Sequence, residues 1–223
     1  MIHVGNDIVD LKTPEAMGKS EDIRFIKRVL TPYEQQMVQH SEHPDTLIWA
    51  LWAAKETAFK AISKSAPDVS SAPRRYPVQN LVKFDSDKIS STLCGVVDSP
   101  HGSVTVKAFI TEEYVHCIGV AGSANSLESI AYGMDRISMD KTNTGIIPGS
   151  ESISKQESLA VRRLAKKDIA SYLQLKEQDI QIIRHKTQNR LNPPKVYTKG
   201  KTKNMEISLS HDGRFAAYAF INL

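Results

Sequence analysis

The sequence predicts an α+β fold made of two halves, each with a long helix followed by a pair of antiparallel strands. Helix starts are indicated where a Ser or Thr is followed three residues later by Glu, in Thr31-Pro32-Tyr33-Glu34 and Ser154-Lys155-Gln156-Glu157. Paired β-rich runs predict two hairpins, over 104–110 with 114–121 and over 207–210 with 215–221. We therefore expect pseudo-symmetric halves over residues 1–124 and 125–223, with antiparallel sheets and a ligand cleft between them.

In the first half, an apolar run predicts a strand and three helix patterns follow it. Proline at a first helical position marks the longest of these helices. In chain order we expect a strand over 2–9, helices over 22–30 and from Thr31, a long helix from Pro44 through Lys60, and a loop over 63–77 before the hairpin.

The second half begins with a connection rich in Ser, Asn and Gly. It ends on a hairpin whose Asp212-Gly213 dipeptide is a strong turn signal. Between these we expect a strand near 130–137, a helix from Ser154 to about Leu173, a strand over 180–184 and a Pro-Pro loop.

The composition is that of an ordinary globular protein and excludes several functional classes. The 29 basic and 25 acidic residues leave a net charge of +4, which fits an acidic partner or a phosphorylated ligand but is too small to indicate nucleic acid. No apolar run is long enough to span a bilayer and no signal peptide opens the chain, so we expect a cytoplasmic protein without a membrane partner. Cys94 and Cys117 are expected to be free thiols.

Three charged residues suggest chemistry. Asp7 lies near the end of the first strand, and Glu56 and Lys60 lie one turn apart on a helix whose Trp, Ala and Phe residues predict burial. If strand and helix pack together, the two carboxylates can share one Mg²⁺ beside Lys60, a combination that usually also holds a phosphate. The alternatives are that Asp7 is a turn residue and that Glu56 and Lys60 form a surface ion pair contributing ~0.3 kcal/mol. Asp10, on the other strand face, could join the metal only if the strand ended by Val9.

Several polar residues are candidates for holding that phosphate. Ser210 and His211 end a strand at a tight turn, where hydroxyl and imidazole can both donate to a phosphate oxygen. The remaining candidates are basic: Lys155, Arg162 and Lys166 on one helix face, and Arg190 and Lys195 flanking Pro193-Pro194. A surface histidine, a solvated basic face and an exposed turn are the plainer interpretations. The chain has no Walker loop, no dinucleotide-binding fingerprint and no nucleophile elbow.

Four segments together resemble the 4′-phosphopantetheinyl transferase superfamily. The first three look like the small holo-[acyl-carrier-protein] synthases, whereas the total length looks like the two-half, surfactin-type enzymes. The segments are Gly5-Asn6-Asp7-Ile8-Val9, Arg24 to Thr31, Trp52-Ala53-Ala54-Lys55-Glu56-Thr57-Ala58-Phe59-Lys60-Ala61 and Ile207-Ser208-Leu209-Ser210-His211. The resemblance implies a 4′-phosphopantetheinyl transferase-like fold.

The resemblance also implies a reaction: transfer of phosphopantetheine from coenzyme A to a serine of an apo acyl or peptidyl carrier protein or polyketide carrier domain, releasing 3′,5′-ADP. By position, Asp7 and Glu56 would bind Mg²⁺, Glu56 would serve as general base, and Lys60 would contact the diphosphate. Residues expected to bind coenzyme A are Ser210, His211, Arg162, Lys155 and either Arg190 or Lys195. With both halves in one chain, a monomer is expected.

Three departures from the family pattern leave alternatives open. Val9 stands where two-half members often carry a third acidic metal ligand. The half that binds metal comes first, as in the small synthases, and the Gly-basic-Pro motif appears as Asn189-Arg190-Leu191-Asn192-Pro193-Pro194-Lys195, which leaves Arg190 and Lys195 as alternatives for the basic residue. A diverged protein that binds coenzyme A or a carrier without transfer is therefore a second hypothesis, and nucleic-acid binding through the dispersed basic faces a third.

Overall fold

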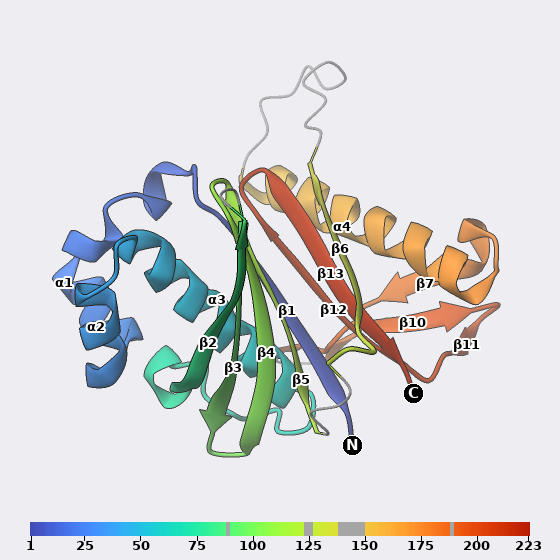
Figure 1. Ribbon diagram of the computed structural model, residues 1–223. Helices are drawn as coiled ribbons and strands as arrows, with labels where there is room; N and C mark the ends of the chain where they lie inside the picture. Colours follow the sequence, from blue (N-terminus) through green and yellow to red (C-terminus); the bar gives the residue numbers. More distant parts are fainter. Residues whose placement is uncertain (88–89, 123–126, 138–149, 188–189) are drawn as a thin grey trace.

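The first half of the chain forms a five-stranded antiparallel sheet with one long helix packed across one face (Figure 1). The computed structural model describes residues 1–87, 90–122, 127–137, 150–187 and 190–223, with backbone only for 83–87, 150–154 and 190. The sheet order is β1-β5-β4-β3-β2, so the first strand lies at an edge. The strands are β1 (His3–Asp10), β2 (Val78–Asp87), β3 (Ser90–Ser99), β4 (Gly102–Thr111) and β5 (Tyr114–Ala121).

The helices of this half begin within one residue of the starts that the sequence predicts. Asp22 caps the first by accepting from the Phe25 amide, and Thr31 and Glu34 form both hydrogen bonds of a capping box. The helices are α1 (Ile23–Val29), α2 (Pro32–Gln39) and α3 (Pro44–Ile62), with 3₁₀ turns η1 (Pro14–Ala16), η2 (Lys19–Glu21) and η3 (Pro73–Arg75). Within the described ranges, no helix is both long and apolar enough to cross a membrane.

A pair of glycines fixes the distance between α3 and the sheet. Gly5 on β1 and Gly119 on β5 are direct cross-strand partners, and both face Thr57. A Cβ on Gly5 would lie 2.0 Å from the Thr57 carbonyl oxygen, so only glycine permits this approach. The Thr57 hydroxyl donates to the Cys117 carbonyl at 3.2 Å. This close contact holds the helix residues next to Thr57 against the strand residues next to Gly5.

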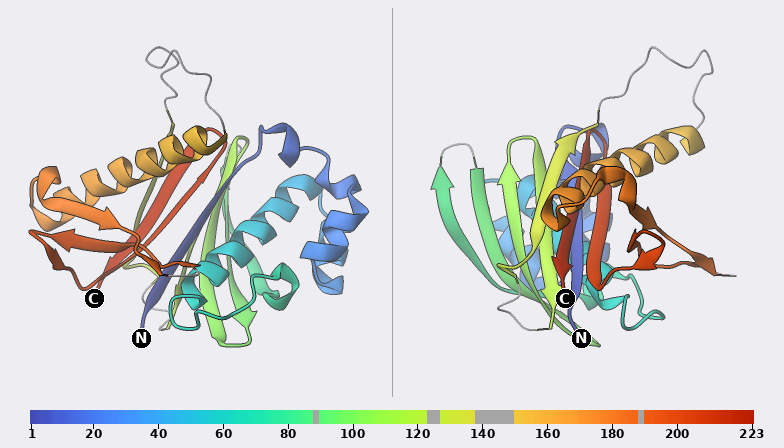
Figure 2. Two further views of the ribbon diagram at one scale, coloured as in Figure 1. Left: turned by 180° about the vertical axis from the view of Figure 1, so that it is seen from behind. Right: turned by 90° about the vertical axis from the view of Figure 1, so that its right-hand side faces the viewer.

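The second half packs another long helix across a smaller sheet of order β12-β13-β6 (Figure 2). Ala165 and Ile169 of this helix are buried against Ile207, Tyr218 and Phe220 of the sheet. The large elements are β6 (Ala131–Arg136), α4 (Ser150–Leu173), β12 (Met205–Asp212) and β13 (Phe215–Asn222). The smaller ones are η5 (Glu177–Asp179), β7 (Ile180–Ile183), β8 (Lys186–Thr187), β9 (Arg190–Leu191), β10 (Lys195–Thr198) and β11 (Lys201–Thr202).

The halves meet where β12 runs along the open edge of β1 (Figure 1). The two strands belong to different sheets, and side chains of β12 accept the outward amides of β1. The Asn6 amide donates to Ser208 Oγ at 3.0 Å, and the Asp10 amide donates to Asp212 Oδ2 at 2.8 Å. The Asn6 side chain also donates to Ser210 Oγ at 2.8 Å. Polar side chains thus bind the edge of one sheet to the other half.

Three features of the fold differ from the sequence-based predictions. Helix α4 begins at Ser150, so Ser154 lies inside the helix rather than at its cap. Strands β2 and β3 were not predicted; in β2, bulges between Gln79 and Val82 and between Phe84 and Ser86 interrupt the alternation of side chains that identifies a strand. The short strands β8 to β11 were also missed, because most have only two residues and show no periodicity.

Candidate functional site

Strand β1 and helix α3 bring Asp7, Glu56 and Lys60 together. The Lys60 ammonium lies 2.7 Å from Asp7 Oδ1 and 3.0 Å from the Asn6 carbonyl oxygen. Asp7 and Glu56 line one and the same cavity. The sequence-based expectation that these three residues gather at the strand–helix contact matches this arrangement.

Glu56 is a largely buried carboxylate without a cationic partner among the described residues. Burial, and secondarily the negative charge of Asp7, raise its pKa to about 7. Burial also raises the pKa of Asp7, although Lys60 opposes that shift. Among the described residues, Glu56 has no hydrogen-bond donor and no ion-pair partner, whereas Asp7 has Lys60. Two oxygen-donor groups with only one nearby ammonium fit a hard divalent cation.

The described residues hold no group of three or more His, Cys, Asp or Glu side chains placed to bind a metal together. Mg²⁺ commonly uses one or two carboxylates, with water and substrate phosphate as its other ligands. Asp7 and Glu56 therefore suffice as the protein's share of such a site.

Asp10 is excluded from the metal site because β1 continues through it and Arg214 neutralises it. Arg214 Nε and Nη2 donate to Asp10 Oδ2 and Oδ1, each at 2.8 Å. Although burial raises the pKa of the Asp10 carboxyl, these hydrogen bonds bring the pKa below its usual value. Asp10 thus helps to hold the two halves together through its ion pair with Arg214.

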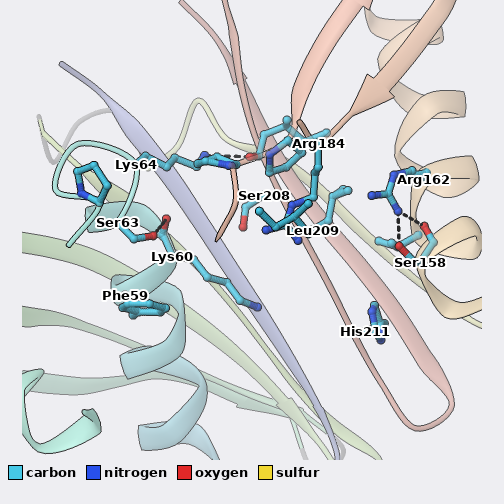
Figure 3. Close-up of a pocket in the computed structure, with 16 residues that line it drawn as sticks. Phe59, Lys60, Ser63, Lys64, Ser158, Arg162, Arg184, Ser208, Leu209 and His211 are labelled. Carbon is cyan, nitrogen blue, oxygen red and sulfur yellow. Dashed lines mark hydrogen bonds between the residues drawn. The ribbon is translucent and has the colours of Figure 1, made fainter. Parts of the chain in front are cut away.

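A cationic cavity of about 370 Å³ lies beside Lys60 (Figure 3). Figure 3 shows Lys60 from α3 and Arg162 from α4 on opposite sides of this cavity. Lys64 and Arg184 add two more cations to its lining, and among the described residues lining it none is Asp or Glu. Partial burial, together with the charge of Arg162, lowers the pKa of Arg184. We call this the basic cavity; its crowded positive charges favour a ligand with several negative charges.

A second cavity of about 300 Å³ lies on the other side of Lys60 and Asp7. Its described lining contains carboxylates and aromatic rings but no Lys or Arg. The carboxylates are Asp7, Glu15, Glu56 and Asp212, and the rings are Phe25, Trp49 and Trp52. We call this the acidic cavity. His211 lines both cavities and therefore marks their boundary.

His211 is held at this boundary by Glu157 of α4, with 3.2 Å between Nδ1 and Glu157 Oε2. Burial lowers the pKa of His211, while Glu157 opposes the shift. An imidazole oriented in this way presents its other nitrogen away from Glu157, where it can bind a phosphate oxygen.

Of the other residues predicted to contact the ligand, some line a cavity and others do not. Arg162 lines the basic cavity, where one guanidinium nitrogen donates to the Ser158 carbonyl oxygen at 2.6 Å. Ser210 is buried under Asn6 and lines neither cavity, whereas Ser208 lines the basic one. Lys155 is exposed and outside both cavity linings.

The two candidates beside the Pro-Pro loop also lie apart from the basic cavity's described lining. Lys195 lines a third cavity, of about 450 Å³, next to Pro193 and Pro194. Arg190 lies in β9, and its side chain falls outside the described residues. From this segment, the described residues that line the basic cavity are Leu191, Pro193 and Pro194.

Sequence reasoning missed Lys64, Arg184 and Asp212. Lys64 follows the end of α3, which stops at Ile62, so the residue spacing of that helix gave no signal for it. Arg184 and Asp212 line the cavities because of how the second half packs. No local sequence pattern predicts that packing.

The comparisons with known proteins give one match. A family model described as ACPS, 4′-phosphopantetheinyl transferase superfamily, matches residues 3–118, just over half of the chain. The match includes Asp7, Glu56 and Lys60 and ends before α4. No curated protein matches the chain.

Proposed function

Because this chain belongs to the 4′-phosphopantetheinyl transferase superfamily, we propose that it transfers 4′-phosphopantetheine from coenzyme A to a serine of an apo carrier protein, releasing 3′,5′-ADP. One observation carries the proposal: Lys60 and Asp7, 2.7 Å apart, join a cavity lined by cations to one lined by carboxylates. A polyanionic donor suits the first cavity, and activation of a hydroxyl suits the second.

The basic cavity would receive the nucleotide end of coenzyme A. Arg162 and Arg184 offer planar guanidinium groups to phosphate oxygens, whereas the Lys64 ammonium is already paired with Glu206 at 2.8 Å. Lys60 and His211 lie toward the acidic cavity, so the diphosphate would extend from the arginines toward them. No carboxylate among the described lining residues repels this ligand.

Asp7 and Glu56 would hold a magnesium ion at the diphosphate, because they are oxygen donors and Glu56 lacks a cation. When bound, magnesium neutralises charge on the transferring phosphoryl group. Lys60 stabilises the same charge from the side of the basic cavity.

Glu56 would also receive the proton of the carrier serine, directly or through a water molecule. Without a bound cation, burial raises the pKa of Glu56 to about 7, and a carboxylate made more basic by burial is suited to accept this proton. The serine oxygen forms a bond to the phosphorus that bears the pantetheine arm. The bond from that phosphorus to the bridging diphosphate oxygen breaks, and 3′,5′-ADP leaves with the electron pair.

The proposed partners are coenzyme A and an apo acyl, peptidyl or polyketide carrier, with the protein acting as a monomer. The test is a mass-gain assay. The protein is incubated with coenzyme A, Mg²⁺ and a panel of apo carriers, and the mass of each carrier is then measured by mass spectrometry. We expect one carrier or more to gain the mass of the phosphopantetheine arm. Asp7→Ala and Glu56→Gln should abolish the gain without unfolding the protein, whereas Glu112→Gln on the exposed β4–β5 turn should keep it.

Binding of coenzyme A without mass gain on any carrier would instead favour a diverged, non-catalytic binding protein. Val9 motivates this alternative, since it is 5% exposed and packed in the core where two-half relatives often carry an acid. Full activity of both Asp7→Ala and Glu56→Gln would remove the proposed metal site.

A further inference from the structure

The last residue of β12, Asp212, brings a carboxylate from the second half into the acidic cavity. Its Oδ2 accepts the Asp10 amide at 2.8 Å, which fixes the side chain against the edge of β1. Asp7 lies on the same strand, three residues before Asp10, and lines the same cavity. Two halves of the chain therefore each contribute an acid to the cavity wall.

Asp212 differs from the neighbouring acids in having no cation among the described residues. Asp10 is paired with Arg214 and Asp7 with Lys60. Asp212 has only the neutral Asp10 amide as a hydrogen-bond donor, although Asp7, Asp10 and Glu157 are close enough to repel its charge. Glu56 is likewise unpaired. The cavity thus holds two partly buried carboxylates without a cation, which is the charge that one divalent ion neutralises.

Val9 explains why β1 itself adds no second acid to this cavity. It follows Asp7 by two residues, lies on the same face of β1 and lines the same cavity, but its side chain is apolar and packs against the α3 core. Strand β1 therefore supplies one carboxylate to the cavity, and any third acid must come from another element. Asp212 is the described acid of the second half that lines this cavity.

We propose that Asp212 is a positioning residue for the divalent cation held by Asp7 and Glu56, acting through a water molecule bound to that cation. The inference rests on the proposed function. We assign an indirect contact because Asp7, Glu56 and Asp212 are not placed to bind one metal ion together. Mg²⁺ usually keeps several of its waters, and carboxylates that accept hydrogen bonds from bound ligands orient them.

The experiment measures Mn²⁺ binding to the full-length protein, with and without coenzyme A, by electron paramagnetic resonance and water-proton relaxation. Asp212→Asn is the main variant, because its amide oxygen can still accept from the Asp10 amide. Glu15→Gln is the matched control, since Glu15 lines the same cavity but is exposed on the segment after β1. Glu56→Gln is the reference for loss of a direct ligand.

We expect Asp212→Asn to bind Mn²⁺ roughly 10–100-fold more weakly, as removal of a supporting partner of a metal ligand does, with altered relaxation of the bound water. Glu15→Gln should stay within about twofold of the unmodified protein, as expected for an exposed charge. If Asp212→Asn unfolds, Asp212→Glu, which keeps the charge, provides the comparison and should bind Mn²⁺ more tightly than Asp212→Ser.

Wild-type Mn²⁺ affinity and relaxation in Asp212→Asn would overturn the inference, as would equal affinities of the Glu and Ser variants. Absence of Mn²⁺ binding by the unmodified protein would overturn it as well. The proposed function fails on a different readout, the mass of the carrier. Carrier modification with unchanged Mn²⁺ binding in Asp212→Asn would therefore reject the role of Asp212 alone.

Discussion

Asp10 and Arg214 lie 204 residues apart in the chain, yet their side chains form a two-pronged ion pair with both N–O distances at 2.8 Å. The Arg214 amide makes a further hydrogen bond of 2.9 Å to Asp10 Oδ2. Gly213, at φ +50°, keeps the turn so close that a Cβ there would lie 2.6 Å from the same oxygen. The hairpin turn of the second half is therefore built around a buried carboxylate of the first half.

Replacing Arg214 should weaken the whole fold. Arg214→Ala leaves the Asp10 carboxylate, 1% exposed, without its cation, so we expect a loss of about 3 kcal/mol in the free energy of unfolding. Urea denaturation followed by fluorescence measures it. Arg136→Ala is the control, because the Arg136–Glu113 pair is exposed and should contribute less than about 1 kcal/mol. Equal losses in the two variants would contradict a special role for Asp10–Arg214.

Gly5 should tolerate no side chain. In Gly5→Ala the new Cβ would meet the Thr57 backbone, so α3 must move, and we expect a loss of about 3 kcal/mol. The shift also separates Glu56 and Lys60 from Asp7, which should slow carrier modification roughly 100-fold. Thermal unfolding and the mass-gain assay measure the two effects. Gly18→Ala, where the φ of +66° is strained but space is open, should cost only about 1 kcal/mol and leave the rate unchanged.

Glu56→Gln should stabilise the metal-free protein at high pH. The pKa of Glu56 is about 7 when folded, against 4.5 when unfolded, so between these values the folded state binds the extra proton. Stability from this group is therefore present below pH 4.5 and is lost as the pH rises toward 7. In EDTA we expect Glu56→Gln to be more stable than wild type by roughly 1–3 kcal/mol at pH 8 and nearly equal at pH 4.5.

Denaturation curves at several pH values give this comparison, with Glu112→Gln as an exposed control. Added Mg²⁺ should stabilise the unmodified protein and leave Glu56→Gln unaffected. A stability difference that does not change with pH would show that Glu56 has an ordinary pKa in the folded protein.

Coenzyme A binding should depend on which face of α4 carries the arginine. Arg162 lines the basic cavity, whereas its neighbour Arg163 is exposed and does not line that cavity. Calorimetric titration with coenzyme A should show a roughly 10–100-fold weaker affinity for Arg162→Ala, as expected for loss of a charge-assisted hydrogen bond. Arg163→Ala should bind within about twofold of wild type. Similar effects of both changes would mean that α4 acts only through its net charge.

The parts of the site that lie within one element could be predicted from the sequence. The spacing of Glu56 and Lys60 places them on one helix face, and the capping boxes and prolines located α2 and α3 within a residue or two. The mixed α+β class with antiparallel sheets is confirmed. These features depend on neighbours within four residues, which the sequence shows directly.

The parts that depend on packing between distant segments could not be predicted. Ser210 was expected to contact coenzyme A because it stands beside His211, but successive strand residues face opposite ways, and Ser210 is bonded to Asn6. Arg184 and Asp212 line the cavities only because the second half packs against the first, and no local sequence pattern indicates that packing. In β2 and β3, the pairing with neighbouring strands outweighs a weak local pattern.

The covered edge of β1 also sets the order in which the protein can fold. Asn6 and its partners on β12 are 202 and 204 residues apart, so these bonds close nearly the longest loop that this chain can form. During synthesis β1 emerges almost two hundred residues before β12. Until then a strand with unpaired amides is open to pairing with another chain, and the carboxylates of the acidic cavity have no opposite wall. The same late step of folding, the packing of β12 against β1, therefore completes the acidic cavity and covers the edge that could aggregate.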